Sequence, residues 1–224
     1  FSARGLFDRN RSLWDSYALE FPKFNLFFSC DTGYGPLYSE LGKSWAFDYA
    51  LIPIGAYEPK SIMSAVHVTP EQAIKIAKGK YLAFCDADDL WEMNKLENQL
   101  NFMKKKNINF SFTSYNIIND LGNIIGNRKA YEEITFKQLL RSCDIGLSTV
   151  IVEKKTINDL NINFPNIKTK EDYVVWLYLS KNGVRMMGLQ ENLTSWRKLS
   201  DSLSSSIFQK ILDGYRVYRV YLKL

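Results

Sequence analysis

The chain has 224 residues, of which 46% are hydrophobic and 24% are charged. This apolar content is sufficient for one or two packed cores, so it excludes a disordered tail and predicts a soluble globular protein. There is no run of about 18 apolar residues and no charged start followed by an apolar stretch, so we expect neither a transmembrane helix nor a signal peptide. The three cysteines show no CxxC spacing. This argues against a disulfide framework and a thiolate zinc site, and it favours reduced thiols in the cytoplasm.

The charge is unevenly distributed along the chain. Residues 1–78 hold 8 basic and 8 acidic residues, whereas residues 79–224 hold 21 and 16, so the whole net charge of +5 lies in the second part. Asparagine changes at the same place, from 2 residues before this point to 15 after it. Such a shift indicates a change of module or of ancestry.

The first part is predicted to alternate short strands and helices. Apolar runs at residues 26–30 and 47–54 predict buried strands, and Pro36 to Gly42 predicts a short helix between them. Thr69 and Pro70 predict the start of a second helix, which ends before the strand at residues 81–85. This β-α-β-α-β order favours a parallel sheet, because parallel neighbours require crossover connections.

The second part continues with both kinds of element. Helices are predicted at residues 92–106, 135–142, 172–182 and 207–224, and strands at residues 110–118 and 149–152. Residues 120–123 supply hairpin turn chemistry before two further apolar residues.

Three carboxylates, Asp86, Asp88 and Asp89, directly follow the predicted strand at residues 81–85. Open α/β sheets bind ligands at this end of their strands, and clustered carboxylates require a cation. Hard oxygen ligands suit Mg²⁺ or Mn²⁺, which usually keeps substrate phosphate in its coordination shell. The alternative is that Asp86 and Asp89 only end a strand and cap the next helix.

The stretch from Lys78 to Trp91, followed by Lys95-Leu-Glu-Asn-Gln-Leu100, resembles the second half of inverting family 2 glycosyltransferases, which have a GT-A fold. The resemblance continues through residues 112–116, 144–149, 170–173 and 194–205, so it extends from about residue 75 towards residue 224. It implies that Asp86 and Asp88 hold a divalent metal on the donor diphosphate.

The same resemblance implies roles for further residues. Asp172 corresponds to the aspartate that acts as general base, and Arg197 to an arginine that meets the diphosphate. The substrate-binding set that it implies is Asp86, Asp89, Glu171, Trp196 and Arg197. Considered without the family, Asp172 could be a helix N-cap and Arg197 a surface cation.

Residues 1–78 do not fit that family. They resemble metallo-β-lactamase-fold hydrolases similar to N-acylphosphatidylethanolamine phospholipase D, through the stretches at residues 1–10, 28–36, 51–59 and 66–73. This resemblance implies that Asp31 and His67 are remnant zinc ligands. His67 is the only histidine of the chain, and two ligands cannot hold a catalytic zinc, which normally has three protein ligands and a water. The alternative is a turn aspartate and an unliganded histidine.

Together the two resemblances predict a chimera. Its fold class is α/β, with a GT-A-like (Rossmann-like) mixed sheet flanked by helices and an N-terminal metallo-β-lactamase-fold fragment that supplies β-α-β-α elements. We expect two domains, the hydrolase-like fragment at residues 1–78 and the metal- and acceptor-binding half of a glycosyltransferase at residues 79–224. The hydrolase-like elements could replace the missing nucleotide-binding strands in one continuous sheet.

The last helix, residues 207–224, has an apolar stripe with four basic residues and one acid. The stripe either docks on the parent domain or lies on an anionic membrane surface, at the inner face of the membrane. The basic residues form no aromatic-interleaved stripe beyond this helix, which argues against nucleic-acid binding.

The leading functional hypothesis is a metal-dependent, inverting glycosyltransferase of bacterial surface polysaccharide synthesis, impaired in its donor half. It would use a nucleotide-sugar donor, a saccharide or lipid-linked acceptor, and Mn²⁺ or Mg²⁺. One alternative is a Zn²⁺ phosphodiesterase remnant, and another is a catalytically inactive chimera.

Overall fold

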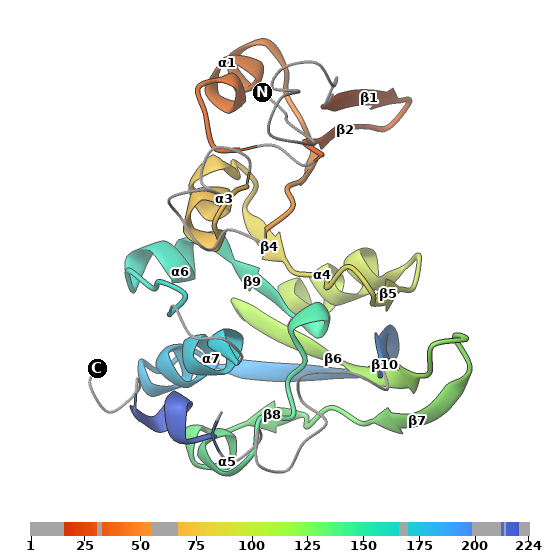
Figure 1. Ribbon diagram of the computed structural model, residues 1–224. Coiled ribbons are helices and arrows are strands. Elements are labelled where there is room, and N and C mark those ends of the chain that lie inside the picture. Colours follow the sequence, from red (N-terminus) through yellow and green to blue (C-terminus); the bar gives the residue numbers. More distant parts are fainter. Residues whose placement is uncertain are drawn as a thin grey trace, which may run out of the picture. The chain divides into compact units, whose positions relative to one another are not determined.

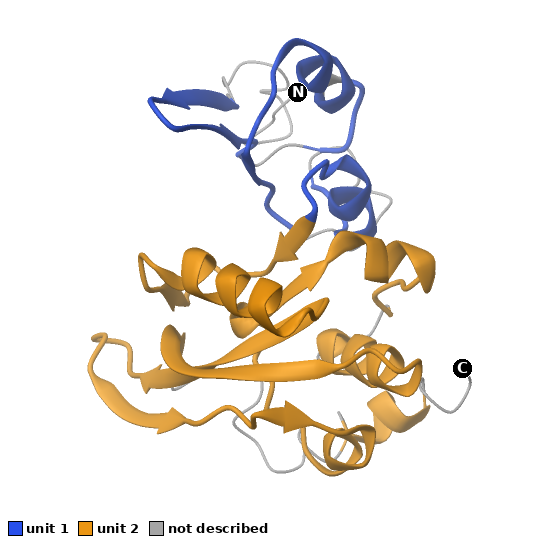
Figure 2. Cartoon of the chain, turned by 180° about the vertical axis from the view of Figure 1, so that it is seen from behind, with its two compact units in different colours: residues 1–80 blue, residues 81–224 orange. Residues whose placement is uncertain are grey.

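The computed structural model describes residues 16–30, 33–54, 67–165, 170–198, 212 and 214–219. The chain forms two compact units, residues 1–80 and residues 81–224, which are coloured separately in Figure 2. Among the described residues, no helix is long and apolar enough to span a membrane.

The first unit contains a small sheet with two helices. Strands β1 (Tyr17–Phe21) and β2 (Phe24–Phe28) form an antiparallel hairpin, and β2 pairs in parallel with β3 (Tyr49–Leu51) across helix α1 (Leu37–Ser44). Helix α3 (Pro70–Ile76) follows and begins with a capping box made by Thr69 and Gln72. The predicted β-α-β-α order is therefore confirmed, with β1 as an additional strand.

The second unit is a mixed sheet flanked by helices (Figure 1). Its strand order is β4-β9-β6-β10-β5, with β7 paired to β6 and β8 paired to β10. The strands are β4 (Tyr81–Ala83), β5 (Leu90–Trp91), β6 (Phe110–Ile118), β7 (Ile124–Arg128), β8 (Glu133–Ile134), β9 (Ile151–Glu153) and β10 (Met186–Arg197). The helices are α4 (Lys95–Lys106), α5 (Phe136–Arg141), the 3₁₀ turn η1 (Leu147–Thr149), α6 (Lys154–Asp159) and α7 (Glu171–Lys181).

The expectation of a parallel sheet that continues into β4 is wrong. Among the described strands of the second unit, only β6 and β10 pair in parallel, and β4 pairs antiparallel with β9. The strands β1, β2 and β3 form a sheet of their own, so the hydrolase-like strands do not continue the larger sheet. The physical reason is that the hydrogen-bonding partner of β4 comes from residues 151–153, far along the chain.

One part of the core of the second unit lies between α7 and the sheet. Trp176 of α7 is fully buried, and its ring makes edge contacts with Phe84 and Phe110. Another part includes Met103 of α4, packed with Ile151 of β9 and Met187 of β10. Strand β6 is buried along its first five residues, and its position agrees with the β-rich stretch that predicted it. The helix predicted from residue 92 starts at Lys95 instead, because Leu90 and Trp91 pair with β10 and the Glu92 amide donates to the Leu193 carbonyl.

The predicted helix at residues 207–224 lies only partly within the described residues. Residues 212 and 214–219 are helical, the Val217 side chain is fully buried, and the Tyr218 hydroxyl donates to the Leu140 carbonyl at the end of α5. The Tyr218 hydrogen bond links this segment to α5. Tyr215 of the same segment is exposed.

Candidate active site

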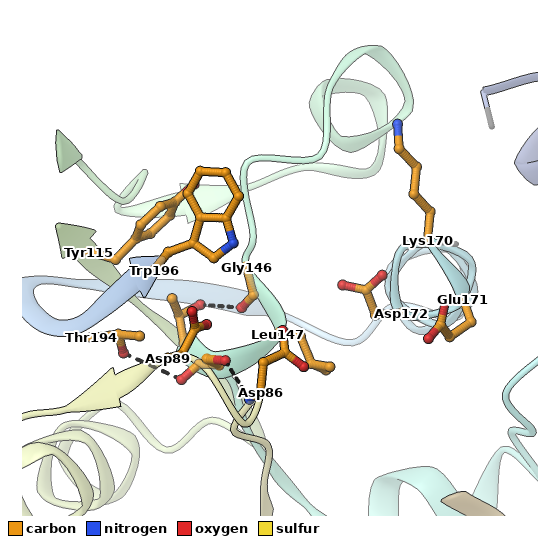
Figure 3. Close-up of a pocket in the computed structure, with 12 residues that line it drawn as sticks. Asp86, Asp89, Tyr115, Gly146, Leu147, Lys170, Glu171, Asp172, Thr194 and Trp196 are labelled. Carbon is orange, nitrogen blue, oxygen red and sulfur yellow. Dashed lines mark hydrogen bonds between the residues drawn. The ribbon is translucent and has the colours of Figure 1, made fainter. Parts of the chain in front are cut away.

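A cavity of about 390 Å³ lies at one edge of the larger sheet (Figure 3). It is lined by Asp86, Asp89, Tyr115, Gly146, Leu147, Ser148, Thr149, Lys170, Glu171, Asp172, Thr194 and Trp196. These residues come from the loop after β4, from β6, from η1, from the start of α7 and from the end of β10. Of the residues predicted for the site, Asp86, Asp89, Glu171, Asp172 and Trp196 are therefore brought together.

The strand directions explain this convergence. Because β4 and β6 each pair antiparallel with β9, they run in the same direction, and β10 runs parallel to β6. The carboxyl ends of β4, β6 and β10 consequently meet at one edge, together with η1, which precedes β9. This is the edge at which open α/β sheets bind their ligands.

Several carboxylates surround Asp86. Burial, as the largest cause, and the charges of Asp89, Asp88 and Glu171, in that order, together raise the pKa of its carboxyl group to about 6. The cluster therefore favours a bound cation or a proton, and this agrees with a site for a hard divalent ion.

Asp89 is a buried carboxylate with structural partners. It accepts a hydrogen bond from the Arg197 backbone amide at 2.9 Å and one from Ser148. Burial raises its pKa, and these two hydrogen bonds oppose that shift. It does not cap the following helix, because the N-cap of α4 is Asn94.

Asp172 lies in the first turn of α7, one residue after Glu171. Burial raises the pKa of its carboxyl group to about 7, the charges of Glu171 and Asp86 raise it as well, and a hydrogen bond from the Tyr173 backbone amide opposes the shift. The N-cap of α7 is Lys170, at φ 62°, so the alternative of Asp172 as the N-cap is wrong. A buried carboxyl group that titrates near neutral pH is suited to accept a proton.

Asp88 and Arg197 are described but are not among the residues that line the cavity. The Arg197 guanidinium donates from Nε to the Asp88 carbonyl at 2.9 Å, and from Nη1 to the Asn119 and Asp120 carbonyls at 3.0 and 3.1 Å. Arg197 is thus half-buried and engaged, rather than a free surface cation. It joins the acidic loop after β4 to the turn between β6 and β7.

The chemistry of this donor set fits a divalent ion that completes its shell with substrate oxygens. Within the described ranges, no group of three or more His, Cys, Asp or Glu side chains is arranged to hold a metal. Mg²⁺ is usually bound by one or two carboxylates together with substrate phosphates, so such a group is not required. Asp88 is close enough for its charge to raise the pKa of Asp86, and these two carboxylates are the available pair.

Of the two residues that the resemblance suggests as remnant zinc ligands, Asp31 lies outside the described residues, and His67 is half-buried just before α3. The described part of the chain therefore supplies no further ligand set for this alternative.

Sequence reasoning missed seven residues of the cavity lining, namely Tyr115, Gly146, Leu147, Ser148, Thr149, Lys170 and Thr194. Each belongs to a stretch that carried the family resemblance, but none is a carboxylate, so no cluster of charge marked it. Burial raises the pKa of the Tyr115 hydroxyl, with the opposing charge of Arg128 as the next cause.

Comparisons with known proteins agree with this two-part structure. Residues 1–80 match the family model described as Beta-lactamase superfamily domain, and residues 71–158 match that of Glycosyl transferase family 2. Both matches include residues 71–80, which contain most of α3.

Two curated relatives represent the two parts. The UDP-Glc:alpha-D-GlcNAc-diphosphoundecaprenol beta-1,3-glucosyltransferase WfgD of Escherichia coli is 36% identical over 140 residues, which cover 62% of this chain and 54% of WfgD. The N-acyl-phosphatidylethanolamine-hydrolyzing phospholipase D 1 of Caenorhabditis elegans is 39% identical over 77 residues, which cover 34% of this chain and 22% of that protein. The chain thus spans only about half the length of the glycosyltransferase.

Among solved structures, Staphylococcus aureus TarS 1-349 in complex with UDP-GlcNAc aligns with a TM-score of 0.53 and 18% identity, over 85% of this chain and 54% of TarS 1-349. This likeness supports the GT-A-like mixed α/β fold. Residues from about 75 to 224 resemble family 2 glycosyltransferases, and residues 1 to about 78 resemble metallo-β-lactamase-fold hydrolases. Both resemblances are confirmed, and a chimera of the two families accounts for them.

Proposed function

We propose that the chain is a metal-dependent, inverting glycosyltransferase that transfers a sugar from a nucleotide-sugar donor to a cell-surface polysaccharide or lipid-linked acceptor. The family 2 match supports the reaction class. The name of WfgD, with its UDP-glucose donor and diphosphoundecaprenol acceptor, supports the substrate classes.

The observation that carries the proposal is Asp172 in the cavity, with its pKa raised to about 7 by burial. In the proposed step the acceptor hydroxyl oxygen attacks the anomeric carbon, its proton passes to the Asp172 carboxylate, and the bond from that carbon to the donor diphosphate oxygen breaks. A single displacement from the opposite face inverts the configuration at this carbon. The nucleoside diphosphate leaves with the electron pair of the broken bond.

Charge on the leaving diphosphate must be stabilised while that bond breaks. We assign Asp86 and Asp88 as the ligands of Mn²⁺ or Mg²⁺, which supplies this stabilisation when it is bound. Asp89, Glu171, Trp196 and Arg197 complete the proposed substrate-binding set.

The proposal also assigns residues 79–224 to the metal- and acceptor-binding half and residues 1–78 to the hydrolase-derived fragment. Because that fragment precedes β4 in place of the family's nucleoside-binding strands, we expect donor affinity to be reduced. If the acceptor is lipid-linked, the protein would act from the cytoplasm as a peripheral protein at the inner face of the membrane.

Transfer from UDP-glucose to a GlcNAc-diphospholipid, measured with and without Mn²⁺, tests the proposal. The full chain is compared with Asp172→Asn and with the matched control Asp159→Asn, an exposed carboxylate on α6 that pairs with Lys155. We expect Mn²⁺-dependent product of inverted configuration from the wild type and the control only. Equal product from all three proteins would contradict the role of Asp172, and turnover unaffected by chelation would contradict the metal.

A further inference from the structure

Ser148 lies at the centre of the 3₁₀ turn η1, and its side chain is 2% exposed. The turn is closed by hydrogen bonds from the Thr149 amide to the Gly146 carbonyl and from the Val150 amide to the Leu147 carbonyl, at 3.0 and 3.1 Å. Because the Ser148 hydroxyl is shielded from bulk water, we expect it to make its hydrogen bonds with protein groups.

The polar groups of Ser148 reach four residues of the site. Its hydroxyl oxygen accepts a hydrogen bond from the Asp86 backbone amide at 2.9 Å, and the same hydroxyl is hydrogen-bonded to the Asp89 carboxylate. Its carbonyl accepts from the Trp91 indole at 2.8 Å and from the Thr194 hydroxyl at 3.3 Å. A hydroxyl has one donor and two acceptor positions, so both bonds of the side chain are satisfied at once.

The acidic loop has few other supports. Asp86 follows β4, which ends at Ala83, and β5 begins only at Leu90. Within the loop, the Asp89 amide donates to the Asp86 carbonyl at 3.1 Å. Beyond this turn and the contacts of Arg197, Ser148 is the group that connects both carboxylate-bearing residues to the sheet.

Helix α4 holds the turn that carries Ser148 in place through a buried side chain. Gln99 is fully buried, and its side-chain amide donates to the Thr149 carbonyl at 2.9 Å and to the Ser111 carbonyl and hydroxyl at 3.1 and 3.0 Å. Its amide oxygen accepts from the buried ammonium of Lys95 at 2.8 Å. A buried hydrogen-bond network of this kind stabilises one position for the turn.

We propose that Ser148 is a positioning residue, which holds the loop that carries the metal-assigned Asp86 and the substrate-assigned Asp89 in the geometry that a divalent cation with a nucleoside diphosphate requires. This inference rests on the proposed glycosyltransferase function. Removal of the hydroxyl leaves the Asp86 amide and the Asp89 carboxylate each short of a buried partner, so the loop shifts and both carboxylates lose their placement. The loss of an orienting partner of this kind typically costs about tenfold to a hundredfold in metal affinity or activity.

The test compares the wild-type chain with Ser148→Ala, Ser148→Thr and the control Ser114→Ala. Ser114 is also a buried serine whose hydroxyl accepts a hydrogen bond from a backbone amide, that of Ala130 at 2.9 Å, but it lies in β6, outside the cavity lining and outside the Gln99 network. Binding of Mn²⁺ in the presence of UDP is measured by electron paramagnetic resonance, and turnover of UDP-glucose is measured in parallel.

We expect Ser148→Ala to weaken Mn²⁺ binding about tenfold or more and to lower kcat, with Ser148→Thr recovering much of both. Ser114→Ala should lose similar thermal stability and bind Mn²⁺ like the wild type. Equal Mn²⁺ affinity of Ser148→Ala and the wild type would overturn the inference, even if the wild type turns over the donor. Absence of wild-type turnover together with weakened binding by Ser148→Ala would instead overturn the proposed function and leave the inference supported.

Discussion

Asp86 and Asp172 face one cavity from different elements, and the negative charge of Asp86 raises the pKa of Asp172 (Figure 3). Burial of Asp172 is the larger cause, followed by the charge of its neighbour Glu171. The carboxylate assigned to the metal thus helps to keep the carboxylate assigned as the base titrating near neutral pH. A cation that neutralised Asp86 would weaken this coupling, so the base should become more acidic when the metal binds.

The first prediction concerns the pH dependence of transfer. Because a general base must be deprotonated, kcat/KM should rise as the pH passes through about 7, the pKa of Asp172. In Asp172→Asn this limb should disappear and kcat should fall by about 10²- to 10⁴-fold. A pH–rate profile between pH 5 and about pH 9 checks this expectation, with Asp159→Asn as the control. A wild-type profile that is flat across pH 7 would refute it.

The second prediction concerns stability in the absence of metal. A folded-state pKa of about 7, above the ordinary value of 3.8 for this carboxyl group, means that the native state binds the proton more tightly than the unfolded state. The stability that this group contributes is therefore present below pH 3.8 and is lost as the pH rises through about 7. Asn resembles the protonated acid, so Asp172→Asn should gain about 1–2 kcal/mol over the wild type at pH 8 and little at pH 4.

Urea unfolding at the two pH values with a chelator present measures this difference. Asp159→Asn should show no comparable change with pH, because that carboxylate is exposed. A gain for Asp172→Asn that is the same at both pH values would show that the effect is one of packing and not of charge.

The local signals of the sequence predicted many of the elements. Thr69 and Thr135 each form the capping box that a threonine followed three residues later by glutamine indicates. The β-rich stretch at residues 110–118 forms β6. The residues after it form the expected hairpin turn, with Gly122 at φ 82°. The cluster of aspartates after β4 was also found at the edge of a cavity.

The rest depended on contacts between distant parts of the chain. Strand β10 carries Glu191 and Asn192 in its middle, where its pairing with β6 shifts register, so its sequence shows no clean alternation. The partners of Arg197 are three backbone carbonyls, which have no residue-type signature. The sequence did not single out Ser148, because its hydrogen bonds depend on the contact between η1 and the loop after β4, which are distant in the chain.

The third prediction concerns Arg197. Lysine has a single nitrogen and cannot reproduce a planar guanidinium that donates to the carbonyls of Asp88, Asn119 and Asp120. Arg197→Lys should lower the free energy of unfolding by about 2 kcal/mol and speed amide exchange in residues 86–89 and 119–123.

The matched control for this change is Arg185→Lys. Arg185 also makes several hydrogen bonds, but its partner is the exposed carboxylate of Glu133, so its loss should cost only about 0.5 kcal/mol. Hydrogen exchange followed by mass spectrometry reports both the free energy of unfolding and the exchange rates in the two loops. If the two variants were equally destabilised and exchange in the two loops stayed slow, Arg197 would not be the link between them.

The fourth prediction tests a close backbone approach in β10. A Cβ added at Gly188 would lie 2.1 Å from the Tyr131 carbonyl oxygen and 2.8 Å from the Ala130 Cβ, because this segment crosses β10 and the Gly188 amide donates to the Glu132 carbonyl. A backbone oxygen held by its own chain cannot move aside cheaply. Gly188→Ala should therefore lower the free energy of unfolding by about 3 kcal/mol.

Gly126 of β7 provides the comparison, since a Cβ there would meet nothing closer than the Ile117 Cδ1 atom at 3.7 Å. Gly126→Ala should change the free energy of unfolding by less than about 1 kcal/mol. The new methyl group meets no close atom, and alanine loses less backbone freedom on folding than glycine does. Urea unfolding followed by tryptophan fluorescence compares the two variants, and Trp196 and Trp91 report on the cavity side of the sheet. Similar midpoints for both variants would mean that residues 130–132 do not pack against β10 in solution.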